Sequence, residues 1–172
     1  MEEEFPDDFP IIFDTVEYFI ITSDETSYTV PEQISGISSY AFYNNKQIKE
    51  VILTSPIDIY SEAFEYSGIE KIDFSKIEII GCNAFRGCTG LNSADLSNAY
   101  LVEDSAFENC TNLRNVTFSD SVYYVGSRAF ANTALTEVEI GGDWCDIGEG
   151  AFEDCKNLKK VNFNDGVAYI NG

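Results

Sequence analysis

Cysteines and carboxylates are the side chains of this 172-residue sequence that could do chemistry, because it contains five cysteines and 30 acidic residues but no histidine. The absence of histidine excludes Ser-His-Asp and Cys-His catalysis and removes the commonest metal ligand. Any other nucleophile would need neighbours that lower its pKa, and the sequence has no convergent set of such groups. We therefore expect a protein that is not an enzyme, has no catalytic residues and uses no cofactor.

Three of the cysteines, Cys88, Cys110 and Cys155, stand at the same place in a repeat, three residues after a phenylalanine. Other copies have Asn, Ser or Thr there, so we expect a tight buried turn in which Cys packs as a small hydrophobe. A disulfide between Cys88 and Cys110, on neighbouring copies, stays open because sequence does not define its geometry. Cys82 and Cys145 fall at other positions, and the spacings of 6, 22, 35 and 10 residues are unlike those of paired zinc ligands. We expect mostly free thiols and no metal site.

The elements that would position such groups follow from a repeated Ala-Phe pair. Its phenylalanines are Phe42, Phe64, Phe85, Phe107, Phe130 and Phe152, at intervals of 22, 21, 22, 23 and 22 residues. A unit of this size cannot bury its own apolar face, so the copies must stack into a solenoid. An aliphatic residue stands five positions before each phenylalanine, and L-x-x-V-x-F or a close equivalent follows it.

Two short strands are predicted for each unit. The last three positions of L-x-x-V-x-F alternate apolar, polar and apolar, which is typical of a strand with one buried face, and stacked copies make a parallel sheet. A second apolar cluster, as in 77 to 80, 122 to 125 and 144 to 147, indicates another strand on the opposite side. The units that begin at Phe64 and Phe130 are one residue shorter in the following turn, which we expect to leave the register intact. The predicted fold is a β-rich curved rod, with a parallel sheet on its concave face and short second strands or turns on its convex side.

The polar face of the stacked strands is the candidate binding surface, because repeat proteins commonly bind along their concave side. Its two central rows are Glu50, Lys71, Ser93, Asn115, Glu137 and Lys160, and Ile52, Asp73, Asp95, Thr117, Glu139 and Asn162. We expect Asp73 to lie beside Asp95 on adjacent strands, where like charges disfavour each other slightly. The face is either simply solvated or recognises a basic partner. A calcium site has little support, since no compact acidic loop offers the six to eight oxygens that Ca²⁺ prefers.

Residues 1 to 27 do not follow the repeat, whereas residues 28 to 172 do. The first part combines five acids within positions 2 to 8 with many strand-forming residues, which predicts an acidic N-terminus and a β-rich cap over the solenoid end. At the other end, the sequence stops a few residues before a seventh Ala-Phe pair would fall. We expect a fragment of a longer protein, and an end-to-end contact with another copy at this truncated unit.

The formal net charge is −20, from 30 acidic and 10 basic residues. Such a charge disfavours nucleic acids and anionic lipid surfaces as partners. No stretch approaches the roughly 18 to 20 apolar residues that span a membrane, and the acidic start lacks the pattern of a signal peptide. A protein or glycan partner, with basic character, is the remaining expectation, without membrane insertion.

The motifs A-F-x-x-C-x-x-L-x-x-V-x-F, at positions 106 to 118, and V/I-G-x-x-A-F, at 147 to 152, resemble those of the BspA-like, or Treponema pallidum type, class of leucine-rich repeats. The resemblance covers residues 28 to 172. It implies a curved leucine-rich repeat solenoid and a frequent occurrence in surface proteins of bacteria and protists that attach to partners. It implies no single ligand.

The leading hypothesis is a non-enzymatic protein- or glycan-binding repeat module of a cell-surface or secreted adhesion protein. The alternative is an intracellular scaffold or structural protein of the cytoplasm that uses the same concave surface. Unpaired cysteines and the missing signal peptide favour that alternative.

Overall fold

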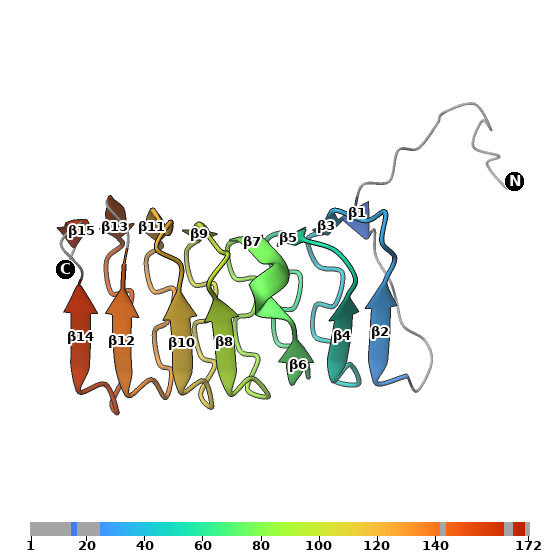
Figure 1. Cartoon of the computed structure of the whole chain (residues 1–172). Helices are drawn as coiled ribbons and strands as arrows, with labels where there is room; N and C mark the ends of the chain where they lie inside the picture. Colours follow the sequence, from blue (N-terminus) through green and yellow to red (C-terminus); the bar gives the residue numbers. More distant parts are fainter. Residues whose placement is uncertain (1–14, 17–24, 142–143, 164–166, 171–172) are drawn as a thin grey trace, which may run out of the picture.

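The computed structural model describes residues 15–16, 25–141, 144–163 and 167–170. Within them the chain winds as a solenoid, and successive coils place their strands in two rows (Figure 1). The front row comprises the even-numbered strands and the back row the odd-numbered ones. The predicted β-rich solenoid with two strands per repeat is confirmed.

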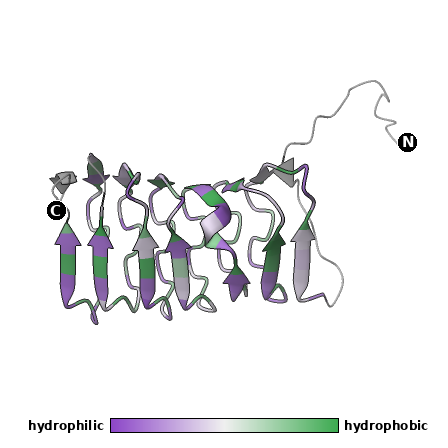
Figure 2. Cartoon of the chain, viewed as in Figure 1, coloured by the Kyte–Doolittle hydropathy of each residue, from purple (hydrophilic) through white to green (hydrophobic). Residues whose placement is uncertain are grey.

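The front row carries the L-x-x-V-x-F segments. Its strands are β2 (Ser27–Val30), β4 (Glu50–Leu53), β6 (Lys71–Ile72), β8 (Ser93–Leu96), β10 (Asn115–Phe118), β12 (Glu137–Ile140) and β14 (Lys160–Phe163). Apolar and polar residues alternate along them, as the colours of β12 and β14 show in Figure 2. Alternation buries one face of each strand and leaves the other in water.

The back row carries the second apolar clusters. Its strands are β1 (Thr15–Val16), β3 (Gly36–Ile37), β5 (Ile57–Ile59), β7 (Ile77–Ile80), β9 (Leu101–Val102), β11 (Tyr124–Val125), β13 (Cys145–Ile147) and β15 (Val167–Ile170). Together they form one continuous parallel sheet of eight strands. The expected cap, residues 1–27, is described at β1, which pairs in parallel with β3, and at residues 25–27, of which Ser27 begins β2. Cap residues 1–14 and 17–24 lie outside the described residues.

The front row, in contrast, is divided into three sheets, of order β2-β4-β6, β8-β10 and β12-β14. The predicted parallel pairing is present in this row, but in three sections instead of one continuous sheet. After Ile72 the chain leaves the extended conformation and forms a 3-10 helix, η1 (Phe74–Lys76), so β6 ends after two residues. The two shortened turns lead into β6 and β12, one at each break. Register is kept within the sheets, where Val51 pairs with Ile72 and Val138 with Val161.

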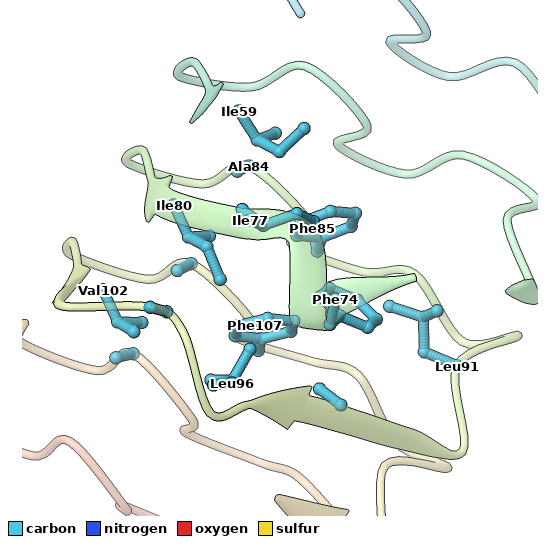
Figure 3. Packing of buried hydrophobic residues seen from close by; sticks show 14 of the residues in the cluster. Ile59, Phe74, Ile77, Ile80, Ala84, Phe85, Leu91, Leu96, Val102 and Phe107 are labelled. Atoms are coloured by element: carbon cyan, nitrogen blue, oxygen red, sulfur yellow. The ribbon is translucent and has the colours of Figure 1, made fainter. Parts of the chain in front are cut away.

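A column of stacked phenylalanines runs along the inside of the solenoid. The rings of Phe42, Phe64, Phe85, Phe107, Phe130 and Phe152 stack with centroids 4.8, 5.0, 5.3, 5.1 and 5.7 Å apart and planes within 9° of parallel. Phe74 packs edge-on against Phe85, and Figure 3 shows both rings beside Phe107 among the aliphatic side chains. Burial of these large apolar surfaces is the main source of stability.

The aliphatic residues five positions before each phenylalanine are buried, as the sequence predicted. Trp144 differs from the rest of the second apolar cluster in which the sequence places it, because it is 78% exposed. Cys145, the next residue, takes the inward position instead. The last front strand is incompletely covered, since β14 pairs on one side only and Phe163 is 42% exposed.

The Ala-Phe pair is held by a third ladder of hydrogen bonds in the turns. The phenylalanine N–H of one coil donates to the alanine carbonyl of the next, for example from Phe64 to Ala84 and from Phe107 to Ala129. Coils approach so closely here that a Cβ on Gly148 would lie 2.3 Å from the backbone nitrogen of Ser127. A side chain at position 148 would therefore collide with the backbone of the preceding coil, and glycine fits this close approach.

Candidate binding surface on the front row

The outward side of the front row, called here the strand face, holds the residues that the sequence proposed as a binding surface. All except Asp73 lie in front-row strands, with side chains that are exposed or half-buried. Strand alternation explains this, because positions on either side of a buried residue point outward. Ile52 is the apolar exception, with 45% of its surface exposed.

Parallel pairing brings residues of opposite charge side by side on the strand face. Glu50 pairs in register with Lys71, and Glu137 with Lys160. The second central row is paired without a cation, since Asp95 is opposite Thr117 and Glu139 is opposite Asn162. The row that begins at Glu50 is thus mixed in charge, whereas the row that begins at Ile52 is more acidic. Ser93 and Asn115 complete the register between β8 and β10.

Asp73 does not take the place that the sequence predicted, beside Asp95 in a continuous sheet. It precedes η1, at φ −81° and ψ 86°, and no ladder joins β6 to β8. Its Oδ1 accepts a hydrogen bond of 2.6 Å from the Ser75 hydroxyl, and its Oδ2 lies 3.9 Å from Lys76 Nζ. The Lys76 ammonium also donates to the carbonyl of Leu53 at 2.8 Å. Both carboxylate oxygens of Asp73 therefore interact with residues of its own coil.

Two hollows in the strand face coincide with the two breaks in the front row. The first has a volume of about 520 Å³ and spans the β6–β8 break; its charged lining is Glu50, Glu70, Lys71, Asp73 and Lys76. Acids and bases are both present there. The Lys49–Glu70 ion pair, 2.9 Å long and exposed, lies at its margin.

The second hollow, called here the acidic hollow, has a volume of about 420 Å³ and lies at the β10–β12 break. Asp120, Glu137 and Glu139 line it together with polar groups that include Asn115 and Asn162, and no lysine or arginine is among its described lining residues. Asp120 was missed by sequence reasoning. It follows β10 in the polar turn Ser119-Asp120-Ser121, and that polar turn was its only sequence signal.

The cysteines are structural in the described part of the chain, where all five are free thiols. Cys88 donates its S–H to the carbonyl of Phe64 at 2.9 Å, and Cys110 to that of Phe85 at 3.0 Å. Cys155 contacts Phe130 in the same way at 3.1 Å. Each Cys therefore ties its turn to the preceding coil, in addition to packing there, and no disulfide joins Cys88 to Cys110.

Burial keeps these thiols protonated. It raises the pKa of Cys88 to about 12, and that of Cys110 well above its ordinary value. Burial, together with the charge of Asp146, raises the pKa of Cys145 to about 11. Since the thiolate is the nucleophile and the metal ligand, these environments oppose both uses. No three described Cys, Asp or Glu side chains come together as a metal site.

A ladder of ion pairs on successive coils was not predicted from the sequence. Arg86 Nη1 lies 3.4 Å from Glu65, and Arg86 Nε lies 3.0 Å from Glu108 without the alignment of a hydrogen bond. Arg128 donates to Glu108 at 2.8 and 3.1 Å and also pairs with Glu153. Four of these residues directly follow a repeat phenylalanine, but Arg128 precedes one by two positions, which hides the pattern.

The two buried acids of this ladder titrate in opposite directions. Burial disfavours the charge of Glu108, but hydrogen bonds and charge from Arg128 and Arg86 outweigh it, so the pKa of Glu108 is lowered. Burial and the negative charge of Glu62 outweigh Arg86 at Glu65, whose pKa is raised. Glu108 has two arginine neighbours and Glu65 has one, and this difference explains why their pKa values shift in opposite directions.

Comparison with known proteins agrees with this architecture. The family model described as the BspA type leucine rich repeat region matches residues 17–102 and 96–172, in six copies. No curated protein matches the chain. Among the described residues, the only helix is η1, so none is long enough to cross a membrane.

Two solved structures are similar. A leucine rich cell surface protein from Faecalibacterium prausnitzii has 29% sequence identity and a TM-score of 0.67, with 80% of this chain and 38% of that chain covered. The leucine rich repeat protein of T. pallidum has 19% identity and a TM-score of 0.51, with 81% and 70% covered, and supports the fold alone. The chain thus spans well under half the length of the F. prausnitzii protein.

Proposed function

Because this chain belongs to the BspA type leucine-rich repeat family, we propose that it is a non-enzymatic binding module that recognises a basic segment of a partner protein on its strand face. The acidic hollow carries this proposal. Three carboxylates, of Asp120, Glu137 and Glu139, line it without a described lysine or arginine. Glu137 has Lys160 as its neighbour on β14, whereas Glu139 is opposite Asn162. A lysine ammonium of a partner would supply a counter-charge within the hollow, as a compact cation with three donors.

The rest of the strand face suits an extended partner. The row of mixed charge offers further polar contacts, from Glu50 and Lys71 on one side of the acidic hollow and from Lys160 on the other. The exposed Ile52 offers an apolar contact in the first hollow. A net charge of −20 adds long-range attraction for a basic partner, which raises the rate of association more than the final affinity.

We place the module at the cell surface or in the secreted fraction, as part of an adhesion protein. The similarity to the F. prausnitzii cell surface protein supports this location, although only 38% of that chain is covered. An intracellular scaffold that uses the same surface is the second candidate. The five free thiols favour it, since reducing compartments keep cysteines unpaired.

The binding test uses a fluorescein-labelled (Gly-Lys-Ser)₄ peptide as the probe and fluorescence anisotropy at about 0.15 M salt, where weak surface attraction is screened. The test variant is Asp120→Asn/Glu137→Gln/Glu139→Gln. Its matched control is Glu25→Gln/Glu32→Gln/Glu149→Gln, which removes three exposed negative charges outside both hollows. We expect the test variant to weaken binding by roughly tenfold or more and the control by less than about twofold.

Equal losses in the two triple variants would show that only bulk charge attracts the peptide, and would overturn the strand-face assignment. If the peptide does not bind but an uncharged oligosaccharide such as cellohexaose does, and the test variant loses it, the partner is a glycan. For location, brief proteolysis of intact source cells followed by mass spectrometry distinguishes the two candidates. Release of peptides without lysis supports the surface; protection until lysis supports the scaffold.

A further inference from the structure

A row of aromatic side chains, half-buried at Tyr100 and exposed at Tyr123 and Trp144, lies on the back row, away from the strand face. Tyr100, Tyr123 and Trp144 stand at the start of three consecutive back-row segments, beside β9, β11 and β13. Tyr123 N–H donates to the carbonyl of Tyr100 at 3.0 Å, and Asp146 N–H donates to the carbonyl of Tyr123 at 2.9 Å, so these coils are direct neighbours. Tyr123 is 50% and Trp144 is 78% exposed. The three residues are called here the aromatic row.

The fold does not need these aromatic groups for its core. The inward positions of the same segments are filled by Ala99, Val122 and Cys145, all of which are buried. The rings of Tyr100 and Tyr123 nevertheless stack on each other, with centroids 5.9 Å apart and planes 19° from parallel. Such stacking gives a rigid apolar platform in water, and Tyr and Trp are the residues most enriched where proteins bind partners.

The surroundings of the aromatic row are negatively charged. Asp58 and Glu78 lie on the two preceding coils, in β5 and β7, and Asp146 lies in β13. Within the described residues, no lysine or arginine forms an ion pair with any of the three. Desolvation and then the charges of Asp58 and Glu78 raise the pKa of the Tyr100 hydroxyl, and desolvation and then Glu78 raise the pKa of Asp58. Tyr100 N–H also donates to the carbonyl of Glu78 at 3.1 Å, so the coil that carries Glu78 lies directly beside the tyrosine platform.

We propose that the aromatic row is a second docking surface, for an arginine-bearing segment of a partner protein. A guanidinium group stacks on aromatic faces and pairs with carboxylates through its planar fork, so one side chain satisfies both features of this surface. The proposal is independent of the strand face. The front-row strands lie on a different side of the rod from the short back-row strands (Figure 1).

Two other ligand classes fit less well. Nucleic acid bases also stack on Tyr and Trp, but the phosphates would face Asp58, Glu78 and Asp146 without a compensating cation. An uncharged glycan could lie on the rings but would leave the same carboxylates without a counter-charge. Charge complementarity therefore selects a basic partner.

The test uses the full ¹⁵N-labelled chain, titrated with a (Gly-Arg-Ser)₄ peptide and followed by NMR and by the fluorescence of Trp144, the only tryptophan. The peptide in which citrulline replaces arginine is the uncharged control. We expect shift changes at Tyr100, Tyr123 and the Trp144 indole with the arginine peptide, and a fluorescence change that the citrulline peptide does not produce. These resonances are separate from those of Glu137 and Glu139, so the two proposed surfaces succeed or fail independently.

Variants identify the groups responsible. Tyr100→Ser/Tyr123→Ser should weaken the affinity at the aromatic row by about threefold to tenfold, as expected for lost cation–π contacts. The matched control is Tyr40→Ser/Tyr43→Ser, which removes another exposed tyrosine pair, with centroids 5.8 Å apart. Asp58→Asn/Glu78→Gln should weaken the same binding while leaving both rings in place.

Three outcomes would overturn the proposal. The first is that the shift changes are confined to the strand face. The second is that the citrulline peptide binds as well as the arginine peptide. The third is that cellohexaose, an uncharged β-glucan, shifts the aromatic-row resonances while the arginine peptide does not, which would make this surface a glycan platform. Wild-type amide dispersion in each variant confirms that the fold is retained.

Discussion

Phe107 lies face to face with Phe85, with ring centroids 5.3 Å apart and planes 8° from parallel. The same column continues to Phe152, which is only half-buried because it lies near the end of the stack. Position in the column should therefore decide how much each ring contributes to stability.

Replacing Phe107 by Ala should lower the free energy of unfolding by about 3 to 5 kcal/mol, because it opens a cavity between two rings that the neighbouring coils hold apart. Phe152→Ala should cost clearly less, since water already reaches that ring. Urea unfolding followed by circular dichroism measures both. Equal costs would show that the column does not act as a continuous core.

The two buried acids of the ion-pair ladder should respond oppositely to neutralisation. Glu108→Gln should destabilise at pH 7 by about 1 to 3 kcal/mol, because it removes charged hydrogen bonds to Arg128. Since the native pKa of Glu108 is lowered, its contribution is present above the ordinary carboxyl pKa and is lost as the pH falls through the native value. The destabilisation should therefore shrink towards pH 3.

Glu65→Gln is the matched comparison, with a side chain of similar burial. The native pKa of Glu65 is raised, so the wild type gains stability as the pH falls from neutral through that value, and ionised Glu65 is a cost above it. The substitution should raise stability at pH 7 and have less effect in acid. Thermal unfolding from pH 3 to 8 gives both profiles, and a destabilising Glu65→Gln at pH 7 would contradict the assignment.

Thiol labelling should separate the cysteines into two groups. At pH 8, Cys88 with a pKa of about 12 has on the order of one thiolate in ten thousand, and burial blocks access as well. Cys88, Cys110 and Cys145 should react with Ellman's reagent only as the protein unfolds. Cys82 and Cys155 are half-buried and should react first. All five should react in guanidinium chloride without reductant; fewer would reveal a disulfide.

Glu62→Gly should stabilise the protein. Glu62 has φ +60°, a left-handed conformation that costs about 1 kcal/mol for a residue with a Cβ. Its charge also raises the pKa of Glu65, so its removal relieves a repulsion. Glu62→Ala is the control, because it removes the charge and keeps the Cβ. If the two variants are equally stable, the left-handed backbone conformation at position 62 does not lower the stability of the protein.

The repeat itself was predictable because it consists of equivalent positions. Regular spacing of Phe85 and Phe107 requires stacked coils, and the alternation in L-x-x-V-x-F places Glu137 and Glu139 on an outward face. The features that the sequence did not predict belong to residues whose structure differs from that of the same position in other coils. Asp73 left the sheet because its coil forms a 3-10 helix, and Trp144 is exposed because its coil is offset, so that Cys145 points inward.

Contacts between different repeat positions were also hidden. Arg128 reaches Glu108 from a position where no other coil has a basic residue, and Tyr100 stacks on Tyr123 outside the consensus. Such pairs depend on which side chains meet across coils, which a superposition of repeats does not display. The strand alternation was thus enough to predict which residues face outward, whereas the hollows were not predictable, and use of this face for binding stays a prediction.

The unequal continuity of the two strand rows has a mechanical consequence. The back row is one unbroken ladder of eight strands, whereas no ladder hydrogen bond crosses either break in the front row. The back row thus joins all coils through one continuous set of strand pairings, whereas the front row joins them in three separate groups. The Ala-Phe ladder in the turns still joins the coils on the two sides of each break. A change in the shape of either hollow therefore needs no strand ladder to break, and the strand face can adjust while the back row stays intact.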